Sequence, residues 1–194
     1  MARTKTSTTT KTKGGVTAAS GYLCAAASAG IKKPGVLDMG LLLSEEPCST
    51  AGTFTSNAVR AYCVDWNDSR LPSQHIRAVL CNSGNANACT GPQGVSDTRH
   101  MVRETARACD VEPNTVLVAS TGVIGRALPM QRIAKALPQL AIPLSPSRQS
   151  GSRFARSIMT TDTRRKEYAV SVRLHRKQFV LGGCAKGSGM ICPN

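Results

Sequence analysis

Short apolar runs of strand length alternate along this chain with segments whose apolar residues recur at helical spacing. The run TVLVAS, residues 115–120, is too short for a helix, whereas VSDTRHMVRETARACD, residues 95–110, carries apolar residues on one helical face. The predicted strands cover residues 36–44, 51–64, 76–91 (continuing into a Gly/Asn loop) and 115–120, with a hairpin over 168–183. The predicted helices cover residues 95–110, 128–137 and 148–159. Alternation without an internal repeat predicts an α/β fold, of mixed α+β type, with a mixed sheet.

The chain divides into a short basic tail and a globular remainder. Residues 1–13, MARTKTSTTTKTK, are of low complexity and are predicted to be disordered, whereas residues 14–194 are predicted to be globular. The 194 residues are 41% hydrophobic but only 4% aromatic, so the core is expected to consist of aliphatic and methionine side chains. No apolar run approaches the roughly 18 residues of a membrane-spanning helix, so no membrane partner is expected.

Eight cysteines are spread through the sequence without a CxxC pair: Cys24, Cys48, Cys63, Cys81, Cys89, Cys109, Cys184 and Cys192. In a chain of this length without a visible secretory signal, this spacing favours reduced, mostly buried thiols over a disulfide framework. The three histidines do not complete a zinc site with them, so no metal is expected. Reduced thiols and the missing signal predict a cytoplasmic location.

The net charge of +14 at pH 7 makes nucleic-acid binding the first function to weigh. Ten basic residues lie from Arg148 to Lys186, against two acids, Asp162 and Glu167. However, the aromatic side chains on which a single-strand binder stacks bases are scarce. The charge therefore favours a solvated surface, or one that faces an acidic partner. No nucleic-acid partner is expected, and a basic RNA-binding protein stays as the alternative from another class.

Two loops that follow predicted strands carry polar groups suited to an oxyanion. The loop CNSGNANACTG, residues 81–91, is rich in short amides, which fit either an oxyanion or carboxylate site or a turn with left-handed backbone conformations. In STGVIG, residues 120–125, the Thr121 hydroxyl and the Gly122 N–H could donate to one oxygen, although a tight turn has the same composition. A third loop, MTTDTRRK at residues 159–166, could bind a ligand or cap a helix.

No common nucleophile motif accompanies these loops. The segment GGCAKGSG, residues 182–189, has its lysine before Gly-Ser, which is not the order of a P-loop, and there is no Gly-x-Ser-x-Gly elbow. A complete set of nucleophile, base and acid cannot be assembled from these residues. An enzyme of this sequence would therefore take its nucleophile from elsewhere.

Eight segments, in order, resemble the bivalent ornithine acetyltransferases, also called the glutamate N-acetyltransferase family. They are GGVTAASGY, AGIKKPG, AGTFTSN, VLCNSGNANACTG, VLVASTGVIG, LPM, SIMTTDT and LGGCAKGSGMICPN. The resemblance covers nearly all of residues 14–194, and it implies a layered sheet-and-helix fold of the N-terminal-nucleophile-like type, completed by a second chain. The family's precursor cuts itself before a threonine. Cleavage is therefore expected just beyond Asn194, and the nucleophilic threonine would begin the β chain of an α₂β₂ heterotetramer.

The resemblance also implies an activity and a set of site residues. The family transfers the acetyl group of N2-acetyl-L-ornithine to L-glutamate through an acyl-enzyme, in arginine biosynthesis and without a cofactor. Thr121 and Gly122 match its oxyanion hole, whereas Thr160 and Lys186 match substrate-binding positions. Lys186 would either pair a substrate carboxylate or act on the nucleophile's amine. Three alternatives stay open: acetyl-CoA as a further donor, acyl transfer in a specialised pathway, and an N-terminal-nucleophile aminopeptidase.

Overall fold

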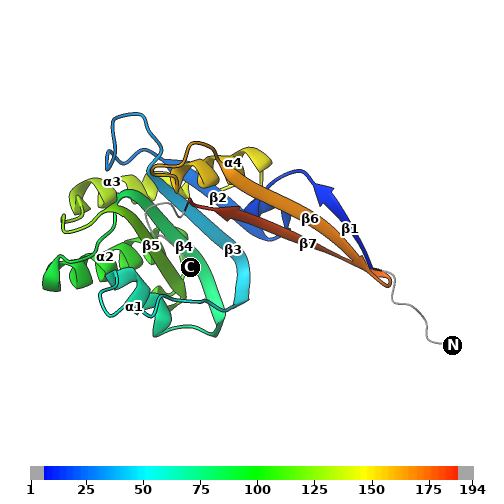
Figure 1. Cartoon of the computed structure of the whole chain (residues 1–194), viewed down its shortest axis with the longest axis horizontal. Helices are drawn as coiled ribbons and strands as arrows, with labels where there is room; N and C mark the ends of the chain where they lie inside the picture. The colour runs from blue at the N-terminus through cyan, green and yellow to red at the C-terminus, as the bar shows by residue number, and fades with distance from the viewer. Residues whose placement is uncertain (1–6, 188–194) are drawn as a thin grey trace.

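The computed structural model describes residues 7–187, which form two β-sheets and four α-helices (Figure 1). The strands are β1 (Ser7–Thr12), β2 (Tyr22–Ala27), β3 (Met39–Thr50), β4 (Ser73–Asn85), β5 (Val116–Val123), β6 (Lys166–Leu174) and β7 (Lys177–Ala185). The helices are α1 (Tyr62–Asp68), α2 (Gly91–Cys109), α3 (Met130–Ala141) and α4 (Arg148–Ser157), with 3₁₀ turns η1 (Val16–Ala18) and η2 (Pro113–Thr115). This combination confirms the predicted α/β class of mixed α+β type.

The larger sheet has the strand order β2-β3-β4-β5 and contains both kinds of pairing. β2, β3 and β4 pair antiparallel, whereas β4 and β5 pair parallel, from Ala78 opposite Val116 to Asn85 opposite Val123. Helix α2 lies in the crossover between these two strands, as a parallel pair requires. Because β4 and β5 run the same way, they end at the same edge of the sheet, where open α/β sheets place their ligands.

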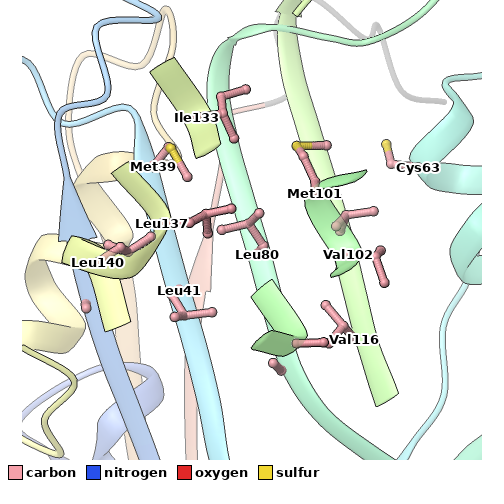
Figure 2. Close-up of a cluster of buried hydrophobic side chains, with 14 of the residues drawn as sticks. Met39, Leu41, Cys63, Leu80, Met101, Val102, Val116, Ile133, Leu137 and Leu140 are labelled. Carbon is pink, nitrogen blue, oxygen red and sulfur yellow. The ribbon is translucent and has the colours of Figure 1, made fainter. Parts of the chain in front are cut away.

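The hydrophobic core lies between the larger sheet and helices α2 and α3 (Figure 2). Met39 and Leu41 are two positions apart on β3, so both side chains lie on the same face of the sheet. Both are fully buried in this core. The helices contribute Met101 and Val102 from α2, and Ile133, Leu137 and Leu140 from α3. These buried side chains are aliphatic, methionine, alanine or cysteine, as the aromatic-poor composition predicts.

Helix α4 packs on the opposite face of the same sheet. Gly40 lies between Met39 and Leu41, so its missing side chain would point away from the core. A Cβ at Gly40 would lie 2.3 Å from the Ser157 hydroxyl oxygen and 2.9 Å from Phe154 Cδ2, because α4 rests directly on the strand backbone. The larger sheet therefore lies between two helical layers, which confirms the expected layered fold.

The smaller sheet has the order β1-β6-β7, and Figure 1 shows β6 and β7 as a long hairpin that runs out from the rest of the molecule. The predicted hairpin over 168–183 is thereby confirmed. The prediction of a disordered tail is wrong for Ser7–Thr12, which pair antiparallel with β6. Threonine is β-branched and favours extended backbone, and the outer edge of β6 supplies the hydrogen-bonding groups. Residues 1–6 lie outside the described residues.

The strand predicted over residues 51–64 is also wrong. Residues 51–61 have no regular structure and are mostly exposed, and α1 begins at Tyr62. Helix α1 packs beside β5, which is the last strand of the larger sheet. Asn67 on α1 accepts from Val118 N (3.1 Å) and donates to Val118 O (2.9 Å), and so it pairs with the free edge of β5.

The remaining predicted elements differ from the structure mainly at their ends. Helix α2 begins at Gly91, before the predicted start at residue 95, because the proline that follows fits the first turn of a helix. β5 continues through Val123, beyond the start of the predicted turn. Within residues 7–187, no helix has both the length and the apolar character needed to cross a membrane.

Candidate active site

Thr121 and Gly122 lie near the end of β5, beside the end of β4. Thr121 is in register with Ser83, and Gly122 is in register with Gly84. Gly122 has a φ of +136°, and a Cβ on it would lie 2.3 Å from the carbonyl carbon of Gly84. Only glycine meets both conditions, since the φ is left-handed and the neighbouring backbone leaves no space. The two strands therefore meet, main chain against main chain, at the predicted oxyanion position.

The Asn-rich segment at the end of β4 and just after it supports the end of β5 from the side. Asn82 donates to Asn85 O (2.9 Å), and Asn85 donates to Ala127 O (3.0 Å). Asn87 has a left-handed φ of 48° and donates to Gly94 O (3.0 Å) in α2. All three side chains are buried and hydrogen-bond to protein groups. Of the two interpretations of this loop, the structure favours the turn with left-handed backbone over a site for an anion.

Hydrogen bonds also join this loop directly to the Ser-Thr-Gly turn. Ala86 N donates to Val123 O (2.9 Å), and Gly125 N donates to Ala88 O (2.8 Å). These bonds continue the β4–β5 pairing past the ends of the strands. The backbone around Gly122 is consequently held on both sides, which is the pre-organisation that an oxyanion site needs.

Asp162 organises the loop between α4 and β6. Its side chain is 1% exposed, and its carboxylate accepts from Thr160 N (3.1 Å), Lys166 Nζ (2.6 Å) and Gly187 N. The hydrogen bond from Lys166 is the main cause that lowers the pKa of Asp162 to about 2. Because this carboxylate joins Thr160 to Gly187, it also brings Lys186 close to the threonine loop. Asp162 therefore has a structural role, like the capping role that the sequence left open.

A pocket of about 420 Å³ opens between the β4–β5 edge and the threonine loop. Gly122 and Thr160, 38 residues apart in the chain, both line it. The other lining residues are Lys32, Gly84, Val123, Ile124 and Thr161. The Thr160 hydroxyl oxygen is buried and has no hydrogen-bond partner among the described residues. A buried hydroxyl without a partner, on a residue that lines a pocket, is a group that a polar ligand would satisfy.

Thr121 and Lys186 lie next to this pocket, although neither is among the residues that line it. Thr121 immediately precedes Gly122 on β5. Lys186 precedes Gly187, whose N–H donates to the same Asp162 carboxylate as Thr160 N, so Lys186 lies beside the threonine loop that lines the pocket. The structure thus gathers the four sequence-predicted residues in one region. The expected cleavage point beyond Asn194 lies outside the described residues.

Lys32 is the pocket residue to which the sequence gave no role. Its ammonium donates to Leu37 O (3.2 Å) and to Met159 O, the residue before Thr160. Burial is the main cause that lowers its pKa, and the charge of Lys186 adds to this, against the raising effects of Asp38 and Asp162. The segment AGIKKPG contains this lysine, but nothing in its local pattern predicts that the side chain reaches the end of β5.

A larger hollow, of about 640 Å³, lies at the start of β4 and is lined by Arg70 and His75 among others. It is at the other end of the strand from Gly122, and none of the sequence-predicted residues lines it. Within residues 7–187, no three His, Cys, Asp or Glu side chains gather as a metal site. The seven cysteines of this range are free thiols, and burial raises the pKa of Cys24 and of Cys81 to about 12. Such thiols are poor nucleophiles near neutral pH, so the candidate site remains the pocket at Gly122.

Comparisons with known proteins identify the family that this chain resembles over most of its length. A model described as the ArgJ family matches residues 23–194. Proteins named arginine biosynthesis bifunctional protein ArgJ are 44% identical in Dehalococcoides mccartyi and 45% identical in Symbiobacterium thermophilum, each over 183 residues. These alignments cover 93% of this chain but only 44% and 45% of the relatives, so the chain spans less than half of their length.

Two solved structures share the fold over nearly the whole chain. The arginine biosynthesis bifunctional protein ArgJ from Bacillus halodurans has a TM-score of 0.91 and 35% sequence identity, covering 98% of this chain and 99% of that one. The ornithine acetyltransferase from Mycobacterium tuberculosis, solved in complex with ornithine, has a TM-score of 0.88 and 38% identity, covering 96% and 99%.

Proposed function

This chain belongs to the ArgJ family, and on that premise we propose that it forms part of an enzyme that transfers the acetyl group of N2-acetyl-L-ornithine to L-glutamate. The observation that carries the proposal is the shared pocket of Gly122 and Thr160, beside Lys186. The complex of a related ornithine acetyltransferase with ornithine supports the choice of substrate. Its place would be arginine biosynthesis, the pathway named for the relatives. The seven free thiols fit the reducing cytoplasm.

The reaction needs a nucleophile, which we assign to an N-terminal threonine on a second chain. Its hydroxyl attacks the acetyl carbonyl, and its own α-amine takes the proton. The Thr121 hydroxyl and the Gly122 N–H donate to the oxyanion that forms. Ornithine leaves with the returned proton. The amine of glutamate then attacks the acyl-enzyme and gives a proton to the α-amine; the ester bond breaks, N-acetylglutamate leaves, and the threonine oxygen takes the proton back. Thr160 and Lys186 hold the substrate, and no step needs a cofactor.

The smaller sheet offers a surface for the second chain. β7 is an edge strand, and Phe179 and Leu181 on it face Val172 and Val170 of β6. Phe179 and Leu181 are 49% and 62% exposed, so this side of the hairpin presents apolar area to solvent. Contiguous exposed apolar surface is typical of an interaction site. We assign it to the β chain, in an α₂β₂ assembly, because the relatives are more than twice as long as this chain.

The proposal is tested on the full-length protein, by N-terminal sequencing and intact-mass analysis followed by an acetyl-transfer assay. We expect a second chain that begins with threonine, in equal amount, and transfer of acetyl from N2-acetyl-L-ornithine to L-glutamate. Acetyl-CoA is offered as a donor in a parallel reaction. Release of free amino acids from peptides without acetyl transfer would overturn the proposal in favour of an aminopeptidase, and salt-dependent RNA binding by an inactive protein would overturn it in favour of a binding protein.

A further inference from the structure

Lys32 is fixed in place by a buried carboxylate. Asp38 is fully buried, and its two oxygens accept from the main-chain N–H groups of Ala29 (2.6 Å), Ile31 (2.7 Å) and Lys32 (3.0 Å). Three such bonds hold the loop between β2 and β3 in one conformation. The backbone of Lys32 therefore has a fixed position, and its side chain starts from a defined point.

The stem of Lys32 reaches the pocket because Gly84 has no side chain. A Cβ on Gly84 would lie 2.9 Å from Lys32 Cγ and 3.2 Å from Ile31 Cγ2. Gly84 is in turn the register partner of Gly122. Only the backbone of Gly84 thus lies between the lysine stem and the predicted oxyanion turn. This contact leads the lysine towards the end of β5, where the pocket lies.

The ammonium of Lys32 has a proton left for a ligand. A lysine ammonium donates three hydrogen bonds, and among the described residues this one donates to the carbonyls of Leu37 and Met159. The nearby carboxylates are engaged elsewhere: Asp38 accepts from main-chain groups, and Asp162 accepts from Thr160, Lys166 and Gly187. Lys186 adds a second positive charge. The group that this arrangement lacks is an anion.

We propose that Lys32 binds the carboxylate of the amino-acid substrate, together with the hydroxyl of Thr160. Two observations converge on this pair: the ammonium is bonded to the residue before Thr160, and the Thr160 hydroxyl is buried without a partner. Both line the same pocket. A carboxylate has two oxygens, so one accepts from each donor. The inference rests on the proposed function and adds a binding residue to it.

The experiment compares a substrate that has the carboxylate with one that lacks it. The full-length enzyme is assayed with N2-acetyl-L-ornithine and with its methyl ester. The proteins compared are the wild type, Lys32→Met and Lys32→Gln. Lys33→Met is the control, because Lys33 is the exposed neighbour of Lys32. We expect Lys32→Met to raise KM for the free acid about 10- to 100-fold, as for a lost charged hydrogen bond, with kcat less affected. KM for the ester is expected to change little, so the variant loses the preference for the acid.

Lys32→Gln separates binding from loop support. Its amide still donates to a main-chain carbonyl but carries no charge. We expect it to retain the melting temperature of the wild type and still to show the raised KM for the acid, and it replaces Lys32→Met if that variant does not fold. Equal losses on acid and ester, or a wild-type KM in Lys32→Gln, would overturn the inference while leaving the proposed function intact. An inactive wild type would instead overturn the proposed function.

Discussion

At position 122 a single residue meets two separate steric conditions. Its φ of +136° is costly for any residue with a side chain, and a Cβ would lie 2.3 Å from Gly84. Gly122→Ala is therefore expected to lower the free energy of unfolding by about 1–3 kcal/mol and to abolish acetyl transfer. Urea unfolding and the transfer assay measure the two effects. Gly91→Ala serves as control, because Gly91 also has a left-handed φ, of +63°, but a Cβ there meets nothing within 4 Å. A Gly122→Ala enzyme as active as this control would contradict the role of the turn.

Thr121 differs from Gly122 in that its contribution comes from its side chain. Thr121→Val keeps the β-branched shape on β5 but removes the hydroxyl. We expect kcat to fall about 100- to 1,000-fold, as for the loss of one oxyanion donor, with KM nearly unchanged. Thr10→Val, at an exposed position of β1, should leave both constants unchanged. A Thr121→Val enzyme whose KM rises while kcat stays the same would place this hydroxyl in substrate binding instead.

The low pKa of Asp162 predicts how the stability of the fold depends on pH. Its folded-state pKa of about 2 is below the ordinary 3.8, because Lys166 and main-chain N–H groups bind the charged form. A depressed carboxyl pKa stabilises the fold above the ordinary value, and this contribution is lost as pH falls from about 4 towards 2. Asp162→Asn should therefore be less stable than wild type at pH 7, and the difference should shrink at pH 3. Urea unfolding at both pH values is the measurement, and a constant difference would contradict the assignment.

Among the elements, α1 shows why an edge strand needs a partner. β5 ends the larger sheet, and Asn67 of α1 pairs with Val118 as a further strand would. Asn67→Ala should lower the free energy of unfolding by about 1–3 kcal/mol, because two buried main-chain groups lose their partners. Asn114→Ala is the control, since Asn114 is exposed. Equal stability of the two variants in urea would mean that α1 holds the edge without this side chain.

The elements also show how far the sequence could predict the fold. Strands and helices with a regular apolar period, such as β5 and α2, follow from local pattern because their burial repeats along the chain. The end of the strand predicted over residues 51–64 is instead the start of α1, whose contact between Asn67 and Val118 joins residues 51 positions apart and leaves no local pattern. β1 was missed for a similar reason: its threonines become a strand only beside β6. Long-range pairing decides both.

The candidate site, too, could be predicted from the sequence only in part. Thr121, Gly122, Thr160 and Lys186 came from loops whose composition and order resemble a family, and the structure gathers them in one region. Lys32 could not be predicted, because its part in the site depends on the space above Gly84 and on the carbonyl of Met159. Each contact links distant parts of the chain. The role of such a residue can be recognised only from the three-dimensional structure.

On the scale of the whole molecule, the exposed apolar side of the β6–β7 hairpin is the surface on which we expect the second chain to bind. Leu181 is 62% exposed on an edge strand. Leu181→Glu should weaken association with the second chain, because a charge would have to be buried in an apolar contact. Native mass spectrometry of the full-length protein measures the assembly. Ile142→Glu is the matched control, since Ile142 is 77% exposed after α3, away from the hairpin. An assembly equally stable in both variants would assign the interface to another surface.

One wall of the pocket consists of main chain alone, where Gly84 and Gly122 meet. Because this wall has no side chains, no substitution in it can make the pocket larger. A side chain added there would make the pocket smaller only by displacing a strand. On the proposed function, a variant designed to accept longer acyl groups must therefore keep both glycines. The side chains that can be shortened are those of Val123, the last residue of β5, and of Ile124, which line the same pocket and are both exposed. On the proposed function, substitutions at Val123 and Ile124 are therefore expected to change the acyl-chain length that the pocket accepts.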